Sequence, residues 1–479
     1  MKKPVSIAVA AAIFGAAAAF VPLSAAHAES LREALASAYL NNPTLKAQRA
    51  AVRAVDESVP QAKSGWRPTV EVTGSIGKAI VDDNTRTTGS SDLTPRGYEI
   101  QVAQPLFRGF RTEAAVEQAK NSVRSAQAGL QATEQEVLLA AATAYMDVIQ
   151  AQAVVELTQN NVDVLQRQLD ATRDRFRVGE VTRTDVAQAE ARVAGAISDR
   201  ISAESELQSV RATYERVVGA VPGEVDTPPP VANLPDSLRE SVELAITSRP
   251  SVVSRQYSAD AAVDNIDQVR GELLPTVNLI GSYGQNWESS RQGFRSDSAS
   301  VVVQATVPLY QAGQVYSRLR ESKHVAGQRR IEVDEAQFDA REAAVQSWEN
   351  LAAARAAIES LTAQVEAAQI ALEGVQREAQ VGARTVLDVL DQEQELLDAR
   401  VNLVRAQRTE FVAAYQLLAS VGRMTVQSLD LPIEAYDPDA HYLDVRDQWI
   451  GGNKWAEDDE ELAITGSERG GPMGVRLGE

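Results

Sequence analysis

The chain repeats itself once, and this duplication limits its fold more than any other feature of its 479 residues. Motifs of the first half recur 207 positions later, and beyond a shortened loop they recur 203 positions later. The clearest pairs are Leu31-Arg32-Glu33 with Leu238-Arg239-Glu240, Pro68-Thr69-Val70 with Pro275-Thr276-Val277, and Pro105-Leu106-Phe107 with Pro308-Leu309-Tyr310. A constant offset across many anchors predicts two copies of one structural unit.

The repeats and their joints divide the chain into five segments. They are a signal peptide (1–28), a first repeat of helix, two strands and long helical hairpin (29–227), a proline-rich linker (228–235), a second repeat (236–429) and an acidic tail (430–479). Proline in Pro228-Pro229-Pro230 stops helices and stiffens the linker. The tail carries Glu457-Asp458-Asp459-Glu460-Glu461, and we expect it to be extended or disordered.

The first residues indicate export. Lys2 and Lys3 precede an apolar run, and the small residues Ala25-Ala26-His27-Ala28 follow it. This order is typical of a secretory signal peptide cut after Ala28, and an uncut membrane anchor is the alternative reading. No later segment offers the roughly 20 consecutive apolar residues of a spanning helix.

Composition excludes most catalytic and nucleic-acid-binding classes. The chain has no cysteine, and after loss of the signal peptide its histidines are His324 and His441, which we expect to be solvated rather than metal ligands. It has no phosphate-binding loop and no nucleophile elbow. A net charge of −19 repels nucleic-acid phosphates. We therefore expect no enzyme activity, no cofactor, no metal and no nucleic acid.

Two pairs of segments alternate between apolar and polar residues, at 66–80 with 96–107 and at 272–287 with 297–310. Val70, Val72 and Ile76 fall on one face of the first segment, and this period of two predicts half-buried strands. The loops within each pair, Asp82 to Thr94 and Ser289 to Ser296, are polar and suit water.

Two long stretches without proline, 106–221 and 309–431, carry apolar residues at steps of three and four. This spacing predicts long helices that pack on partner helices. Val178-Gly179 and Val381-Gly382 interrupt them, because glycine permits the left-handed conformation that ends a helix. A helix of about 65 residues would be about 100 Å long, which suits a tube rather than a globular domain.

Four strands in one chain cannot close a membrane barrel. Unpaired backbone groups at a sheet edge in lipid would each cost several kcal/mol, and closed membrane barrels have about eight strands or more. Two chains would supply eight strands and three would supply twelve. A soluble coiled coil with a small β-sandwich at its end is the alternative.

The duplicated order of helix, two strands and helical hairpin resembles the TolC-like outer-membrane channels, over about residues 30 to 422. Its most specific marks are the two Val-Gly-x-x-Thr turns and the segment from Val381 to Asp391. The resemblance implies a mixed α and β membrane protein: a homotrimer with a twelve-stranded β-barrel in outer-membrane lipid and an α-helical tunnel in the periplasm. It implies a passive duct for type I protein secretion or multidrug efflux. Its expected partners are a periplasmic adaptor (membrane fusion) protein and an inner-membrane ABC or proton-driven transporter.

The resemblance also assigns roles at the hairpin tips. Asp388 and Asp391 resemble the constriction aspartates of the family, and helix spacing puts them on one face. Tip-closing contacts are expected at Arg384, Thr184 and Asp185, and adaptor docking at the turn residues Val178, Gly179, Thr182, Val381, Gly382 and Thr385. An ordinary solvated helix face is the alternative for the aspartates. This chain has Ala379 at a position where members of the family can carry a tyrosine that helps to hold the tip closed.

Two rival functions remain. A periplasmic coiled-coil adaptor is also exported, but it should show one hairpin with flanking β-domains rather than a duplicated pattern. A secreted hydrolase would need a nucleophile motif, which this sequence lacks.

The tip assignment yields a first prediction. Replacing Arg384 and Thr184 together should raise single-channel conductance, because exposed tip contacts are worth only about 0–1 kcal/mol each and few hold the closed state. Single-channel conductance in a planar bilayer measures the effect. A conductance equal to that of the parent channel would show that Arg384 and Thr184 do not hold the tip closed.

Overall fold

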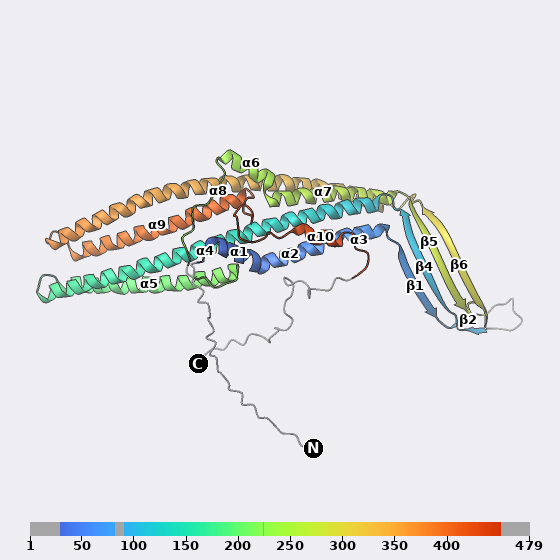
Figure 1. The fold of residues 1–479 in the computed structure, drawn as a ribbon, viewed down its shortest axis with the longest axis horizontal. Coiled ribbons are helices and arrows are strands. Elements are labelled where there is room, and N and C mark those ends of the chain that lie inside the picture. The colour runs from blue at the N-terminus through green and yellow to red at the C-terminus, as the bar shows by residue number, and fades with distance from the viewer. Residues whose placement is uncertain (1–28, 82–90, 224, 452–479) are drawn as a thin grey trace, which may run out of the picture.

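The computed structural model describes residues 29–81, 91–223 and 225–451. The predicted signal peptide and the acidic run Glu457–Glu461 lie outside the described residues. The molecule is long and narrow, with a sheet at one end and two helical hairpins at the other (Figure 1). Both repeats run side by side along this length, as the duplication predicts.

The described helices follow the same order in both repeats. The first repeat has α1 (Leu31–Asn41), α2 (Pro43–Asp56), α3 (Ser58–Lys63), the 3₁₀ turn η1 (Ser64–Trp66), α4 (Arg111–Arg177) and α5 (Arg183–Val218). The second has α6 (Leu238–Ser248), α7 (Pro250–Arg270), η2 (Gly271–Leu273), α8 (Gln314–Gln380) and α9 (Val386–Ser420). The long helices α4 and α8 have 67 residues each, which confirms the length expected from the sequence.

The helix predicted to open each repeat is divided in the structure. Pro43 and Pro250 each begin a new helix, and the preceding Asn42 and Arg249 have extended backbones. Proline pushes the residue before it out of the helical region but fits the first position of a helix. Proline therefore divides the opening helix of both repeats at equivalent positions.

One stretch of α4 is apolar enough, by length and composition, to cross a membrane. Half of that stretch is buried within the chain, because α4 packs against α1, α2, α5, α7 and α9. Packing between helices accounts for its composition.

The four predicted strands form one antiparallel sheet in the order β1-β4-β5-β6. Its strands are β1 (Thr69–Ile76), β4 (Arg96–Phe107), β5 (Thr276–Trp287) and β6 (Arg295–Thr306). A small hairpin, β2 (Ala79–Val81) with β3 (Ser91–Leu93), extends beyond β1. The expectation of an entirely polar loop from Asp82 to Thr94 was wrong at β3, where Leu93 is buried.

Strand register places many apolar residues of the four strands on one face of the sheet, while Ile280 and Val302 pair on the other face. Val70 lies opposite Val102, and Ile100 lies opposite Tyr283. Leu279 lies opposite Val303, which continues this face onto β6. The face is bare within the chain: the exposed fraction is 68% for Val70 and 78% for Val301. A sheet with its apolar face open needs an apolar surrounding.

The largest apolar core lies at mid-length, where α1 and the linker cross α4 and α5. Tyr145 and Tyr214 are fully buried there, with ring centroids 6.5 Å apart. The Tyr145 hydroxyl lies 2.7 Å from the carbonyl oxygen of Glu29 and 2.8 Å from that of Asp226. This belt fastens the start of the chain and the joint between repeats to the long helices.

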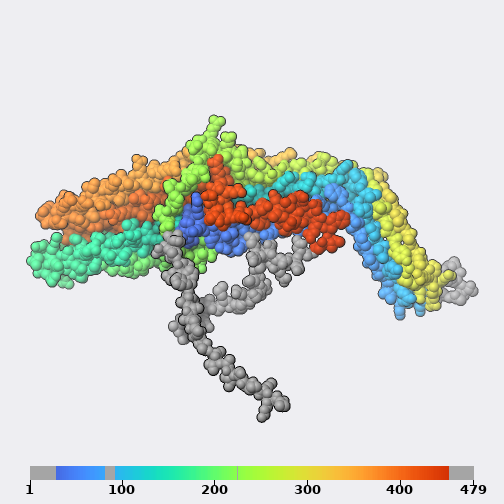
Figure 2. Space-filling model, viewed as in Figure 1, coloured from blue at the N-terminus to red at the C-terminus, as the bar shows by residue number. Residues whose placement is uncertain are grey.

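The first part of the predicted tail, which we expect to be partly disordered, is folded. It forms α10 (Pro438–Val445), which packs on α2 and continues along the helices toward the sheet (Figure 2). The Arg49 guanidinium lies between the rings of Tyr39 and Tyr436, 4.6 and 4.8 Å from their centroids. Stacked aromatic rings stabilise a cation that is shielded from water.

His441 is not the solvated residue expected from the sequence. Its Nδ1 lies 2.9 Å from Oδ2 of Asp56, whose side chain is fully buried. Burial raises the pKa of the Asp56 carboxyl and outweighs the lowering by His441, while the nearby charges of Asp439 and Glu57 raise it further. The histidine therefore compensates a buried carboxylate, which is costly when left alone.

This contact yields a second prediction. His441→Ala should weaken docking of α10 by about 3 kcal/mol at neutral pH, because it leaves a buried carboxylate without its partner. Since the folded pKa of Asp56 is raised, the cost is present above that pKa and falls as acidification protonates the group. Hydrogen exchange of Pro438–Val445, corrected for intrinsic rates, should rise in the variant and fall back at lower pH.

Asp56→Asn supplies the control, because it removes the charge but keeps an acceptor for the imidazole. The double variant Asp56→Asn/His441→Ala should exchange more slowly than His441→Ala alone. Equal exchange in both variants would show that the buried charge does not govern docking.

Candidate functional site at the hairpin tips

The two hairpins turn at the positions predicted from glycine. Gly179 and Gly382 have φ of +82° and +79°, in the left-handed region that favours glycine. In both turns the glycine amide and the next amide donate to carbonyls of the preceding helix, with distances of 2.9 to 3.2 Å. Val178 and Val381 beside them are 72% and 80% exposed. The turns therefore present apolar side chains at the end of the molecule.

Each returning helix begins with the same capping box. The Asp388 carboxylate accepts from the Thr385 amide at 2.9 Å and from its hydroxyl at 2.8 Å, and Thr385 in turn accepts from the Asp388 amide. Thr182 and Asp185 make the equivalent contacts at the start of α5. The pattern of threonine followed three residues later by a carboxylate could have revealed this role in the sequence.

Capping fixes the charge of Asp388. Hydrogen bonds from the Thr385 amide and hydroxyl lower the pKa of this carboxyl, and the Arg384 charge adds to the effect. Asp388 therefore stays ionised well below neutral pH. One of its oxygens is held by its own helix, while its side chain remains partly open to solvent.

The three predicted tip-closing residues do not meet within one chain. The Arg384 side chain donates to the Glu378 carboxylate of its own hairpin at 2.9 Å, and this hydrogen bond, together with the negative charge of Glu378, raises the pKa of Arg384. Asp185 caps α5, and Thr184 is exposed in its first turn. Contacts among Arg384, Thr184 and Asp185 remain a prediction for the assembled protein.

Asp391 has a partner that the sequence did not reveal. Arg192 of α5 lies 2.5 Å from the Asp391 carboxylate of α9, so this pair links the two hairpins of one chain. The residues are 199 positions apart, and only the fold brings them together. The side chains are 40% and 52% exposed, so the pair contributes about 0–1 kcal/mol to holding the hairpins.

Apolar packing behind this pair holds the hairpins more strongly. Leu390 is 1% exposed and packs with buried residues of the other hairpin. The cluster comprises Leu165 and Leu169 of α4, Ala189, Val193 and Ala196 of α5, and Val386 and Leu390 of α9. Burying one leucine is worth about 1.5–3 kcal/mol, several times the exposed ion pair.

The tip offers charge but no assembled catalytic or metal site. Asp388 and Asp391 lie one turn apart on α9, as their spacing predicts. Among the described residues, no group of three or more histidine, cysteine or acidic side chains could hold a metal ion. The arrangement can bias the passage of ions and charged solutes.

Comparison with known proteins gives a family match over both repeats. Residues 34–220 and 242–423 match the family described as outer membrane efflux protein. The outer membrane efflux protein BepC of Brucella suis biovar 1 (strain 1330) is 38% identical over 432 residues, covering 89% of this chain and 92% of that protein. The outer membrane protein TolC of Vibrio cholerae serotype O1 is 28% identical over 85% of this chain and 93% of its own.

Solved structures show the same fold. The CmeC outer membrane channel of Campylobacter jejuni superposes with a TM-score of 0.75 at 14% identity, covering 87% of this chain and 89% of that one. The duplicated architecture and the resemblance inferred from the sequence are thereby confirmed.

The apolar cluster yields a third prediction. Leu390→Ala should let the hairpins separate, because truncating a buried leucine costs about 2–5 kcal/mol, whereas Arg192→Gln should cost about 0–1 kcal/mol. The chain has no cysteine, so spin labels at Ala187→Cys and Ala383→Cys, in labelled chains diluted with unlabelled ones, report the distance between the two hairpins of one chain. Ile370→Ala, an exposed position on α8, is the matched control. A distance distribution in Leu390→Ala as narrow as the control would contradict the role of the cluster.

Proposed function

This chain belongs to the outer membrane efflux protein family, and from that premise we propose that three copies form one passive exit duct. The protein is an outer-membrane channel of the TolC family and not an enzyme.

The main support for a trimer is the sheet, whose two edge strands each lack one neighbour within the chain. β1 and β6 each have one hydrogen-bonded neighbour in the chain, and apolar side chains on one face of the sheet, Val70 and Val301 among them, are exposed. In lipid both edges must be paired, so β1 of one copy would pair with β6 of the next. Three copies would close a barrel of about twelve strands, within the size range of membrane barrels.

The helices supply the second part of the duct. At a rise of about 1.5 Å per residue, α4 and α8 are each about 100 Å long. Such helices extend far beyond a membrane core of about 30 Å. They therefore support a tunnel that leads from the barrel through the periplasm.

The entrance would be a ring at the hairpin tips. Three copies would bring together six carboxylates from Asp388 and Asp391, which attract cations and repel anions. The three Arg192 side chains would offset half of that charge, because each lies on an Asp391 carboxylate. Conduction would then be cation-selective, but less so than six free carboxylates would make it.

The exposed turns are the proposed docking surface for a periplasmic adaptor protein. Val178 and Val381 present apolar surface, and the neighbouring Gly179, Thr182, Gly382 and Thr385 define the shape of each turn. An inner-membrane ABC or proton-driven transporter would supply the energy, since the duct itself is passive.

For the cargo we favour small molecules, because BepC, which covers almost the whole chain, is described as an efflux protein. Type I protein secretion is the second candidate. The inner-membrane pump would select the cargo, so the tip residues alone do not decide between them.

A fourth prediction tests the duct. The purified mature protein should form trimers by crosslinked mass and give small, cation-selective single-channel conductance in a planar bilayer. Arg192→Gln should increase the cation preference, and Asp391→Asn should reduce it, because these changes move the ring charge in opposite directions. A water-soluble monomer without conductance would refute the proposed trimeric duct.

A further inference from the structure

The segment from Tyr436 to Ile450, called here the C-terminal strap, crosses the helices of the first repeat. It contains α10 and runs from mid-length toward the sheet (Figure 2). At the end nearer the sheet, Trp449 is 65% exposed and Ile450 is 91% exposed. Two adjacent large apolar side chains in the open mark a surface for an apolar partner.

The strap is held along one row of side chains on α2 and α3. The row comprises Arg49, Asp56 and Lys63, which contact Tyr436, His441 and Asp447 of the strap in that order. Its members are spaced by seven residues, about two helical turns, so they follow one line along the helices. The strap is therefore fastened at several points and directed toward the sheet.

The row leads to Arg67, just before the first strand. The Arg67 guanidinium lies 4.9 Å from the centroid of the Trp449 ring. Arg67 precedes β1 by two residues, which is about 7 Å at the rise of a strand. The stack of cation on ring therefore holds Trp449 at the height where the sheet begins.

The sheet is still apolar at this height. Along the register of β1 with β4, Arg67 is level with Pro105. Phe107, two residues farther along β4, lies opposite Val277. Apolar side chains of the sheet therefore extend to the level of the Trp449 ring.

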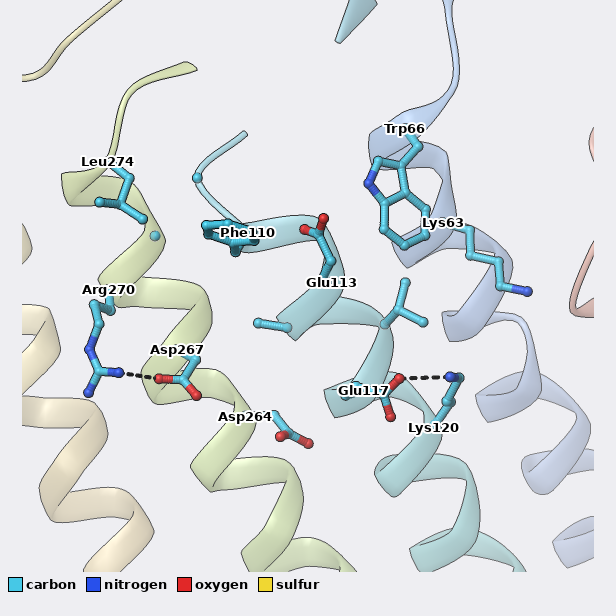
Figure 3. Close-up of a pocket in the computed structure, with 14 residues that line it drawn as sticks. Lys63, Trp66, Phe110, Glu113, Glu117, Lys120, Asp264, Asp267, Arg270 and Leu274 are labelled. Atoms are coloured by element: carbon cyan, nitrogen blue, oxygen red, sulfur yellow. Dashed lines mark hydrogen bonds and ion pairs between the residues drawn. The ribbon is translucent and has the colours of Figure 1, made fainter. Parts of the chain in front are cut away.

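The end of the strap lies on the same side of the molecule as these apolar side chains. The rings of Phe107 and Phe110 meet edge to face, with centroids 5.2 Å apart. Phe110, Trp66 and Lys63 line one cavity between α3, α4 and α7 (Figure 3). Lys63 in turn binds Asp447 of the strap at 2.6 Å. A continuous series of contacts thus joins the apolar face of the sheet to the strap.

The charges beside Trp449 suit a membrane surface. Asp447 is the nearest carboxylate in the sequence, and it pairs with Lys63 at 2.6 Å and with Arg446 at 3.2 Å. The hydrogen bond from Lys63 lowers the pKa of the Asp447 carboxyl, so this group stays ionised and paired. Anionic lipids would therefore meet a compensated carboxylate, with Arg67 as a further cation under the indole ring.

We propose that the C-terminal strap is a membrane anchor, with Trp449 and Ile450 inserted into the periplasmic leaflet of the outer membrane beside the sheet. An indole ring suits the headgroup layer, because it combines a large apolar body with one N–H donor. Ile450, the more exposed of the two, contributes a wholly apolar side chain. This inference goes beyond the proposed duct but rests on the membrane position of its sheet.

The anchor belongs to the first repeat alone. The positions of Arg49, Asp56 and Arg67 correspond to Gln256, Val263 and Leu274 in the second repeat. The second repeat therefore lacks the side chains that hold the strap, and each chain has one anchor. Because the other end of the strap lies in the mid-length belt, the anchor links that belt to the membrane.

The fifth prediction measures the depth of the strap in a bilayer. The chain has no cysteine, so Ile450→Cys carries a single nitroxide label in the full trimer, reconstituted in phospholipid vesicles. Oxygen concentrates in the bilayer and a nickel chelate stays in water. The ratio of oxygen to nickel collision rates should be severalfold higher at position 450 than at Leu443→Cys, an exposed position of α10 farther from the sheet. Equal ratios at the two positions would overturn the proposal.

A change at Trp449 tests the same anchor without altering the labelled position. Trp449→Ser should lower the ratio at position 450 to that at position 443, whereas Trp449→Phe, which keeps an aromatic ring, should preserve most of it. An unchanged ratio in Trp449→Ser would also contradict the anchor.

Conductance of the same samples separates this proposal from the duct. A conducting trimer whose label at position 450 lies in water refutes only the anchor. A non-conducting monomer refutes the duct, and with it the anchor that depends on the membrane position of the sheet.

Discussion

The unpaired edges of the four-stranded sheet are the constraint on which the rest of this protein depends. Each chain brings one strand of 8 residues and three of 12 but leaves β1 and β6 with one neighbour each. A bilayer offers no water to satisfy those backbone groups, so the sheet is incomplete as a membrane structure until other chains continue it. The helices are tied to this sheet, because α4 follows β4 and α7 leads into β5, and the close approach of Gly109 to Gly271 holds the ends of these two helices together.

The duplicated sequence forms two hairpins with the same turn but with different side chains around it. Both returning helices start with a capping box of threonine and aspartate, so the turn itself is conserved between the copies. The side chains around it differ: Arg192 of the first hairpin pairs with Asp391 of the second. A single chain therefore places a charge and its counter-charge on neighbouring hairpins.

The strong contacts lie at mid-length, and the weak contacts lie at the hairpin tips. The mid-length belt is tied by buried tyrosines, the Arg49 stack and the buried Asp56 with His441. At the tips, the ion pairs are exposed and the apolar cluster is small. Exposed pairs contribute little and a small cluster buries little surface, so the tips are the easier place to rearrange.

The sequence by itself determined the repeated architecture, the strands and their apolar faces, the length of the helices and the glycine turns. These features follow from local rules: periodicity of two or of three to four, proline before a helix, and glycine at positive φ. Asp388 and Asp391 could be placed on one helix face by the same rules.

Only the tertiary structure decided which distant residues meet. Arg192 with Asp391, His441 with Asp56, and the cavity between α3, α4 and α7 join positions that no local pattern connects. The physical reason is that helix spacing fixes a face but not the neighbour it faces. That neighbour depends on how four long helices pack and on where the C-terminal segment crosses them.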